Sequence, residues 1–443
     1  MKKWIVVVFC LLFAGRVWAI DINGYLKTDW RLKIDGAGAF NYNENDLGLR
    51  LKSAVGSGAS VFADLELKNI GIARSTTLRE LALYDKTEVA PWTLELKEAY
   101  LDLAGIFVKG LDMRIGKQRT AWGTADRFNP TDNLNPLDLS DVTDFGKRLG
   151  SNSVKATYYT GDCYLQGVFV PLFTPAVLPV NYQSLYNMPA GVTDTIVLPE
   201  NKIANSMFGV KAGGKIFGFD SSISYFYGYD ALPLAKKTTF DCSGTLPPFY
   251  LTSGVGVELE YPKIQVIGLD VAGSISDVGV WAELAYFMPE KFDTETIANH
   301  GSYGPQTSSG TALENPYFKY TVGADYTFPF EIYANVQYCH GFFDERGTSA
   351  NPTMKLRDYL IAEADKKFFD DKLKIALAGF FEMNFSGGDR FFPSYTVYPE
   401  ISYYPFEATE IVLGAYLIES WPEGKFYSSK DSDEMFLKVK YSF

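Results

Sequence analysis

A segment rich in opposite charges, residues 119–150, is the part of the sequence best suited to act on a solute. Its acidic residues are Asp126, Asp132, Asp138, Asp141 and Asp144, and its basic residues are Arg119, Arg127, Lys147 and Arg148. Pro130 and Pro136 restrict its backbone. Pores select solutes by their width and by rings of charged side chains. We therefore expect a constriction if this segment folds into a pore, and a solvated outside loop if it does not.

Catalytic chemistry has little support in the sequence. The chain has two histidines, His300 and His340, and neither a Gly-x-Ser-x-Gly elbow nor a His-Glu-x-x-His motif occurs. The pair Cys339 and His340 has no nearby residues that complete a set of metal ligands. We predict a protein that is not an enzyme, with no catalytic residues, no metal and no cofactor.

The N-terminus predicts export. Lys2 and Lys3 precede an apolar run, and the small residues Val17 and Ala19 precede a cleavage site after Ala19. We expect residues 1–19 to be a cleaved signal peptide. Its removal leaves three scattered cysteines, which is no disulfide framework. The formal net charge of -12 argues against nucleic acid as a partner.

Alternation of apolar and polar residues recurs along the chain. In the last segment Met435, Leu437, Val439, Tyr441 and Phe443 alternate with Phe436, Lys438, Lys440 and Ser442. Successive side chains of a strand point to opposite faces, so each such segment predicts a strand with one apolar and one polar face. We expect eighteen strands, with sixteen as the alternative. They cover 22–33, 44–55, 59–70, 92–104, 110–119, 151–160, 163–171, 206–216, 218–229, 264–275, 278–287, 316–328, 330–342, 356–369, 372–385, 394–404, 408–420 and 433–443.

The connections between these strands alternate in length. Tight turns fall at 56–58, 161–162, 276–277 and 370–371, and long loops cover 71–91, 120–150, 172–205, 230–263 and 288–315. All long loops then emerge at one end of the sheet, as in outer-membrane barrels with short periplasmic turns and long extracellular loops. We predict an all-β fold: one transmembrane, antiparallel, up-and-down β-barrel domain over residues 20–443 in the bacterial outer membrane.

Lipid would contact the apolar strand faces, because the charged residues lie on the other face. A strand in hydrocarbon must also have every backbone group paired, which requires a closed barrel. The inward charges have both signs, so they favour neither anions nor cations. As pore or constriction residues we select Arg114, Arg119, Asp126, Arg127, Asp132, Asp138, Arg148, Glu283, Asp325 and Glu382.

Several short motifs resemble those of bacterial outer-membrane proteins. Arg114, Gly116, Gln118, Trp122, Gly123 and Asp126, followed by Asn135, Pro136 and Asp138, resemble a motif of a porin-like outer-membrane family of largely unassigned function. The segments 98–100, 228–233, 323–326 and 337–341 look like strands of that family. The terminal strand ending in Phe443 is similar to the signal that the barrel-assembly machinery reads. The resemblance implies a barrel, and related families include porins as well as exporters and uptake channels for hydrophobic compounds.

Three functions follow as expectations. The first is a channel for diffusion or facilitated transport of small solutes. The second is uptake or export of hydrophobic compounds through a barrel that the apolar loop 171–205 partly plugs. The third is a surface barrel with a ligand-binding or structural role. Outer-membrane lipid, the assembly machinery, small solutes and further copies of the chain are the expected partners.

Overall fold

The structure is a computed structural model of the 443-residue chain. It describes residues 20–443 except 35–37, 74, 76, 83–88, 142, 180–191, 244–250, 300–303, 348–353, 386, 388 and 389. The predicted signal peptide, residues 1–19, lies outside the described residues.

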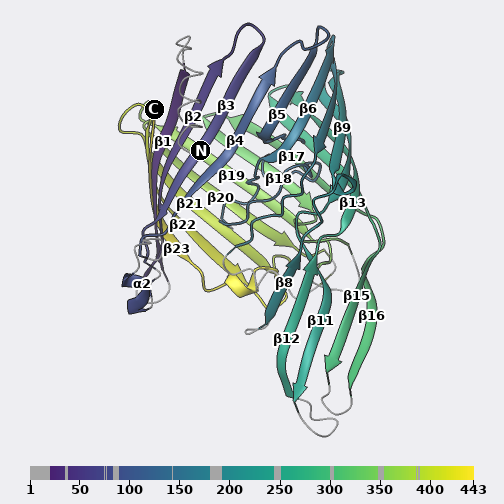
Figure 1. The fold of residues 1–443 in the computed structure, drawn as a ribbon. Helices are drawn as coiled ribbons and strands as arrows, with labels where there is room; N and C mark the ends of the chain where they lie inside the picture. The colour runs from purple at the N-terminus through teal and green to yellow at the C-terminus, as the bar shows by residue number, and fades with distance from the viewer. Residues whose placement is uncertain are drawn as a thin grey trace.

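Eighteen antiparallel strands form one closed sheet (Figure 1). They are β1 (Ile20–Lys33), β2 (Phe40–Ala54), β3 (Ala59–Ile70), β4 (Trp92–Leu103), β5 (Leu111–Gln118), β6 (Ser151–Thr160), β7 (Cys163–Val170), β9 (Met207–Ile216), β10 (Phe219–Tyr229), β13 (Lys263–Ile275), β14 (Val278–Pro289), β17 (Tyr317–Phe328), β18 (Ile332–His340), β19 (Asp358–Phe368), β20 (Leu373–Met383), β21 (Ser394–Tyr403), β22 (Thr409–Ser420) and β23 (Glu434–Ser442). Each pairs with its neighbours, and β1 closes the ring by pairing with both β2 and β23. The predicted barrel of eighteen strands is confirmed.

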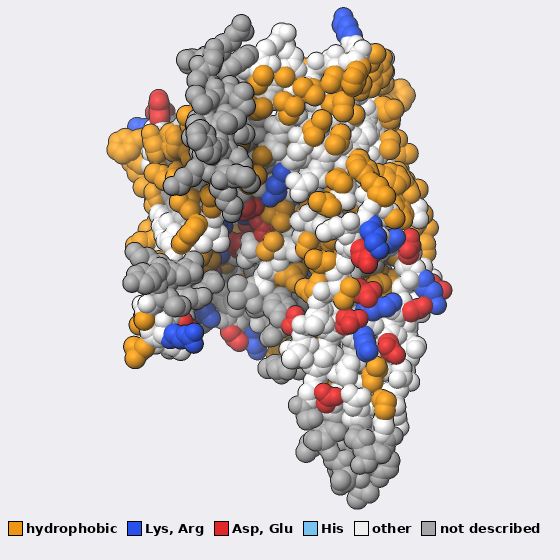
Figure 2. All heavy atoms as spheres, in the orientation of Figure 1, with side chains coloured by type: hydrophobic (Ala, Val, Ile, Leu, Met, Phe, Trp, Pro, Cys, Tyr) orange, Lys and Arg blue, Asp and Glu red, His pale blue; other side chains and the backbone are white. Residues whose placement is uncertain are grey.

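The alternation in the sequence becomes an inside and an outside. On β23, Met435 and Leu437 are 45% and 41% exposed, whereas Phe436 between them is 1% exposed. Apolar side chains cover the outer surface of the barrel (Figure 2). A closed sheet has no unpaired edge, so this apolar surface can face hydrocarbon. The fold is therefore that of a bacterial outer-membrane barrel.

The two ends of the barrel differ in their connections. Two-residue turns such as 161–162, 217–218 and 276–277 join strands at one end, which we call the short-turn end. Gly161 and Gly218 have positive φ angles of 57° and 89°, which tight hairpin turns require. The C-terminus lies at this end (Figure 1), where the backbone N–H groups of Gly24 and Phe443 each donate to the other residue's carbonyl. Long connections leave the opposite, long-loop end.

A second sheet of five strands projects from the long-loop end (Figure 1). Its strands are β8 (Thr193–Val197), β11 (Leu234–Ser243), β12 (Leu251–Glu260), β15 (Phe292–Asn299) and β16 (Pro305–Leu313), in the order β16-β15-β11-β12-β8. They belong to three consecutive connections that the sequence predicts to be loops, and that prediction is wrong. The sheet buries few side chains, chiefly Leu234, Leu259, Phe292 and Leu313 at its root. Its strands are otherwise mostly solvated, so no strong alternation marks them.

Helix is scarce in the described part of the chain. α2 (Leu78–Ala82) begins where Thr77 accepts from the Glu80 N–H and Glu80 accepts from the Thr77 N–H, a reciprocal capping box. Two single turns, η1 (Ile203–Asn205) and η4 (Tyr427–Ser429), complete the helical structure. No helix among the described residues is long and apolar enough to cross a membrane.

Candidate functional site: a charged loop inside the barrel

The connection between β5 and β6 folds into the lumen. Residues 119–150, which we call the inward loop, leave one wall and contact β14, β17 and β18 on another. Its path crosses the inside of the barrel in Figure 1. The inward direction, one of two alternatives at the level of sequence, is therefore the observed one.

Glu283 on β14 is the main anchor of the inward loop. This side chain is 2% exposed, and its carboxylate accepts five hydrogen bonds. The donors are the backbone N–H groups of Thr124 (2.6 Å), Ala125 (2.7 Å) and Thr131 (3.2 Å), the Thr131 hydroxyl (2.8 Å) and the Asn129 amide (3.0 Å). Hydrogen bonds to a charged group contribute about 1.5 to 3 kcal/mol each, so this cluster fixes the loop on β14.

Contacts with β17 and β18 extend the anchor. The Asn335 amide donates to Asp126 at 2.7 Å, and the Asp126 N–H donates to Gln337 at 3.3 Å. The Thr321 hydroxyl donates to the Phe128 carbonyl at 3.1 Å. Three neighbouring strands therefore hold the first part of the loop.

Apolar packing supports the polar contacts. Trp122 and Leu134 join a buried cluster with lumen-facing residues of β7, β9, β10, β13, β14 and β17. Phe128 stacks on Phe343 with ring centroids 4.3 Å apart, and Phe145 packs against Phe380 at 5.2 Å. The inward loop therefore shares a packed core with the barrel wall and is not a solvated outside loop.

A second anchor ties the loop to β1. Arg31 bonds Asp141 of the loop at 2.5 Å and Asp29 of its own strand at 2.9 Å. Burial alone would raise the pKa of Asp141, but the hydrogen bond and positive charge of Arg31 lower it to about 2. Asp141 is therefore ionised near neutral pH and holds the loop to β1.

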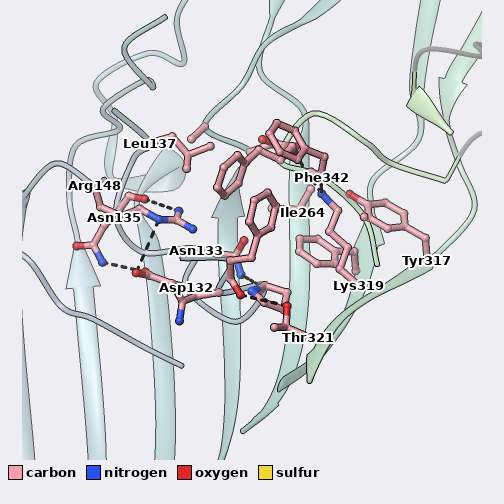
Figure 3. Close-up of a pocket in the computed structure, with 18 of the residues that line it drawn as sticks. Asp132, Asn133, Asn135, Leu137, Arg148, Ile264, Tyr317, Lys319, Thr321 and Phe342 are labelled. Carbon is pink, nitrogen blue, oxygen red and sulfur yellow. Dashed lines mark hydrogen bonds and ion pairs between the residues drawn. The ribbon is translucent and has the colours of Figure 1, made fainter. Parts of the chain in front are cut away.

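Charges inside the loop pair with one another. Asp132 bonds the Asn135 amide at 2.9 Å and lies 3.9 Å from Arg148 (Figure 3). Burial raises the pKa of Asp132 more than Arg148 lowers it. Asp138 bonds Lys147 at 2.9 Å. Burial opposes both charges of that pair, yet mutual attraction and the Ser140 hydroxyl lower the pKa of Asp138, and Asp138 raises that of Lys147.

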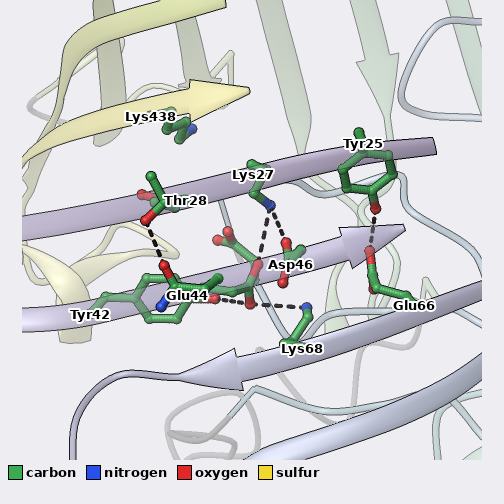
Figure 4. Close-up of polar contacts among 12 residues, drawn as sticks. Tyr25, Lys27, Thr28, Tyr42, Glu44, Asp46, Glu66, Lys68 and Lys438 are labelled. Carbon is green, nitrogen blue, oxygen red and sulfur yellow. Dashed lines mark hydrogen bonds and ion pairs between the residues drawn. The ribbon is translucent and has the colours of Figure 1, made fainter. Parts of the chain in front are cut away.

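The wall of β1–β4 carries a row of alternating charges that faces the lumen (Figure 4). We call it the charge ladder; its members are Lys27, Glu44, Asp46, Glu66, Lys68 and Lys97. Lys27 lies 3.1 Å from Glu44 and 2.9 Å from Asp46, and Lys68 lies 2.9 Å from Glu44. The lysine side chains are 24% to 31% exposed, so their charge is available to a solute in the lumen.

The ten candidate residues separate into three groups. Arg119, Asp126, Arg127, Asp132, Asp138 and Arg148 lie on the inward loop, and Glu283 anchors it. Arg114 pairs with Asp102 at 2.6 Å, and Asp325 lies beside Gly279 in the half of the barrel near the short turns. Glu382 pairs with Arg357 and accepts from the Lys425 N–H at 2.8 Å, in a separate network of the long-loop end.

The structure adds residues that the candidate set lacked. Arg31, Asp141, Gln337 and the charge ladder contact the loop or face the lumen. Their inward register on the strands was a signal for Arg31 and for the ladder. No local signal marks Gln337 as a loop partner, because its contact joins residues far apart in the sequence.

The apolar segment 171–205 takes two paths where it is described. Val177 pairs through its backbone with Leu137 and Leu139 of the inward loop. Residues 193–197 form β8 at an edge of the second sheet. The middle of the segment, 180–191, lies outside the described residues, so its role as a plug stays a prediction.

The comparison with solved structures agrees with the fold. No known family model matches the chain, and no curated protein matches it. The solved structure of Pseudomonas aeruginosa OpdK with vanillate is similar, with a TM-score of 0.52 and 10% identity over 96% of this chain and 98% of that one. The Salmonella typhi OmpF complex with daunomycin has a TM-score of 0.41 and 11% identity over 96% and 98% of the two chains. The closed barrel and its apolar exterior define an outer-membrane β-barrel, and the similarity to OpdK supports this fold.

Proposed function

We propose that the protein is a channel for small hydrophilic solutes, with the inward loop as its constriction. The observation that carries this proposal is the docking of the loop on Glu283, which brings charged residues across the lumen from the charge ladder. Charges of both signs on opposed surfaces form a filter that discriminates by size and by the arrangement of charge. The structure of OpdK, which has a similar fold, was solved with vanillate, a small solute, and this is consistent with a channel role.

The proposal includes the absence of an enzymatic reaction. The lumen-facing charges are bound in ion pairs and to backbone groups, an arrangement suited to positioning a loop and not to activating a nucleophile. His340 faces Asp358 at 2.8 Å and stacks on Tyr320 with ring centroids 4.9 Å apart. These two contacts explain the position of the His340 imidazole without a catalytic role.

Transport of hydrophobic compounds is the second candidate function. Phe342 and Phe343 are only partly buried on an aromatic core of Phe128, Phe145 and Phe380 at the inward loop, and these two rings would favour an apolar solute. A channel of this kind would take up an uncharged aromatic compound into vesicles faster than a charged solute of equal size. The polar channel would show the reverse order.

The proposed partners follow from the same barrel. Outer-membrane lipid covers the apolar outer face, and small solutes enter the lumen. The barrel-assembly machinery would read β23 and Phe443, the strand that closes the ring against β1. Association into a homo-oligomer stays a prediction.

Planar-bilayer recording tests the proposal. The wild-type protein should give discrete open-channel currents in KCl. Glu283→Ala removes the acceptor of five loop donors and should raise the conductance, because the loop leaves the wall. Asp325→Asn is the matched control: it neutralises an inward acidic residue on the neighbouring strand β17 without a loop contact, and should leave the conductance near the wild-type value. Closed wild-type traces at all voltages, or equal conductance in all three proteins, would overturn the proposal.

A further inference from the structure

A cavity lies between the inward loop, β14, β17 and the connection that follows β18 (Figure 3). It has a volume of about 60 Å³. Its apolar lining comes mainly from Phe128, Ile264, Phe287, Tyr317 and Phe342. An engineered apolar cavity of about 150 Å³ holds benzene, whereas a water molecule occupies about 30 Å³. The cavity therefore has room for a group the size of a carboxylate, but not for a whole aromatic ring.

Lys319 on β17 supplies an unusual charge to this cavity. The residue is 7% exposed, and its ammonium donates to the carbonyls of Phe342 at 2.6 Å and Phe343 at 3.2 Å. An ammonium has three donors, so two carbonyls leave one unused. Lys319 makes no ion pair with any residue in the described ranges. A buried charge without a counter-charge is costly, and an anion in the cavity would remove that cost.

The neighbouring acids are already engaged by other cations. Asp230 pairs with Arg346 at 2.9 Å, and Lys425 pairs with both Asp344 (2.9 Å) and Glu345 (3.2 Å). The rings of Phe287 and Tyr317 lie 5.4 and 5.9 Å from the Lys319 ammonium, a cation-π contact that offsets only part of the missing charge. These acids therefore do not pair with Lys319, and an anionic ligand can take the place of a counter-charge beside its ammonium.

The lining also limits which anion fits. Asp132, Asp230 and Arg148 also line the cavity, but Asp132 lies beside Arg148 and Asp230 pairs with Arg346. Among the described lining residues Lys319 is therefore the cation to be balanced, and a singly charged anion is enough to balance it. The aromatic and aliphatic walls favour a ligand with a short apolar part, which chloride lacks. A monocarboxylate with a small apolar group meets both conditions.

We propose that this cavity binds a small organic monocarboxylate, with its carboxylate on Lys319 and its apolar part against the aromatic walls. The inference rests on the proposed channel function and deepens it by naming a class of solute. The site lies against the inward loop, because Phe128 and Asp132 of that loop form part of its lining. A carboxylate bound there would sit beside the path that the loop narrows.

Saturation-transfer NMR on the purified protein in detergent tests the site, with acetate as the probe and acetamide as its neutral counterpart. The wild-type protein should transfer magnetisation to the acetate methyl group and much less to acetamide. Lys319→Met keeps an unbranched side chain of similar length without its charge and should lower acetate affinity about tenfold or more, because the charge-assisted hydrogen bond to the carboxylate is lost. Lys155→Met is the matched control, because Lys155 is an inward lysine of β6 outside the cavity lining, and should bind acetate like the wild type.

Three results would overturn the site: no acetate signal with folded wild-type protein, equal signals for acetate and acetamide, or unchanged acetate binding by folded Lys319→Met. If Lys319→Met fails to fold, the acetate and acetamide contrast in the wild type decides alone. This binding assay is independent of current. Acetate binding without conductance would leave the site standing and reject the channel, and conductance without acetate binding would do the reverse.

Discussion

The lumen has two opposed walls that treat charge differently. On the wall of β14, β17 and β18, the acidic residue Glu283 is buried under the inward loop. Its carboxylate accepts hydrogen bonds from five loop donors. On the wall of β1–β4, the lysines of the charge ladder bridge acidic neighbours but remain partly exposed. A carboxylate thus binds the loop on one wall, whereas on the other wall carboxylates pair with lysines that face the lumen.

This difference separates the residues that set the width of the lumen from the residues that set its ion preference. Changes on the loop-bearing wall should alter how wide the lumen is, because they release or displace the loop. Changes on the charge ladder should alter which ions pass, because they change the field without moving the backbone. The two readouts, conductance and ion preference, are independent in a bilayer recording.

Gly123→Val should have the largest effect, on the loop-bearing wall. A Cβ at Gly123 would lie 2.4 Å from the Glu283 carboxylate, and its φ of +88° already disfavours a β-branched residue. We expect loop docking to weaken by about 2 to 4 kcal/mol and single-channel conductance to rise. Gly218→Val is the control: φ is +89° in a short turn with open space around the Cβ, so only the backbone strain is shared. An equal rise in both variants would show that strain, not loop displacement, is responsible.

Lys27→Gln should have a moderate effect, on the charge ladder. Loss of the Lys27 ammonium leaves Glu44 and Asp46 without their shared cation and makes that wall more negative. A unit charge acting over about 4 Å of water contributes about 1 kcal/mol, so the permeability ratio of K⁺ to Cl⁻ should rise up to about fivefold. The measurement is the reversal potential in a KCl gradient. Lys215→Gln, at an exposed position near the short turns, should change the ratio less; a conductance change without a shift in reversal potential would contradict the assignment.

Acid should produce the smallest effect, through the Arg31 and Asp141 anchor. The pKa of Asp141 is lowered from 3.8 to about 2, so the ion pair contributes its full stability above pH 3.8 and loses it as the pH falls through about 2. Current fluctuations of the open channel should therefore increase between pH 4 and pH 2. Asp141→Asn should fluctuate already at neutral pH and respond less to acid in that window. If the wild-type channel fluctuates equally little at pH 2 and pH 7, the Arg31 and Asp141 ion pair does not hold the loop.

The barrel could be predicted from the sequence because lipid imposes a simple rule on each strand. Every barrel strand needs an apolar outer face, and the alternation around Leu437 or Leu413 shows that face without knowledge of its neighbours. The second sheet follows no such rule, since its strands face water on most of their surface. The sequence of a segment such as Thr193–Val197, which is exposed along its length, therefore predicts a loop.

The candidate site was only partly predictable for a different reason. The sequence marks 119–150 as charged and conformationally restrained, but its direction depends on Glu283, which lies more than 150 residues away from Thr124. Glu283 itself was selected because its register on β14 is inward, and the register says nothing of which group it binds. Arg114 and Asp325 share that inward register, yet they lie toward the short turns and away from the loop anchor.

Cross-linking shows whether the inward loop rests against β18 in the working channel. Asp126 and Asn335 are joined by a 2.7 Å hydrogen bond, so cysteines at these two positions should react with a short bifunctional thiol reagent. Replacing Cys163 and Cys242 with serine removes two competing thiols, and the third, Cys339, is 1% exposed. We expect efficient cross-linking and the same single-channel conductance before and after the reaction, because the loop already rests against β18. No cross-link, or a fall in conductance when it forms, would show that the loop lies elsewhere in the working channel.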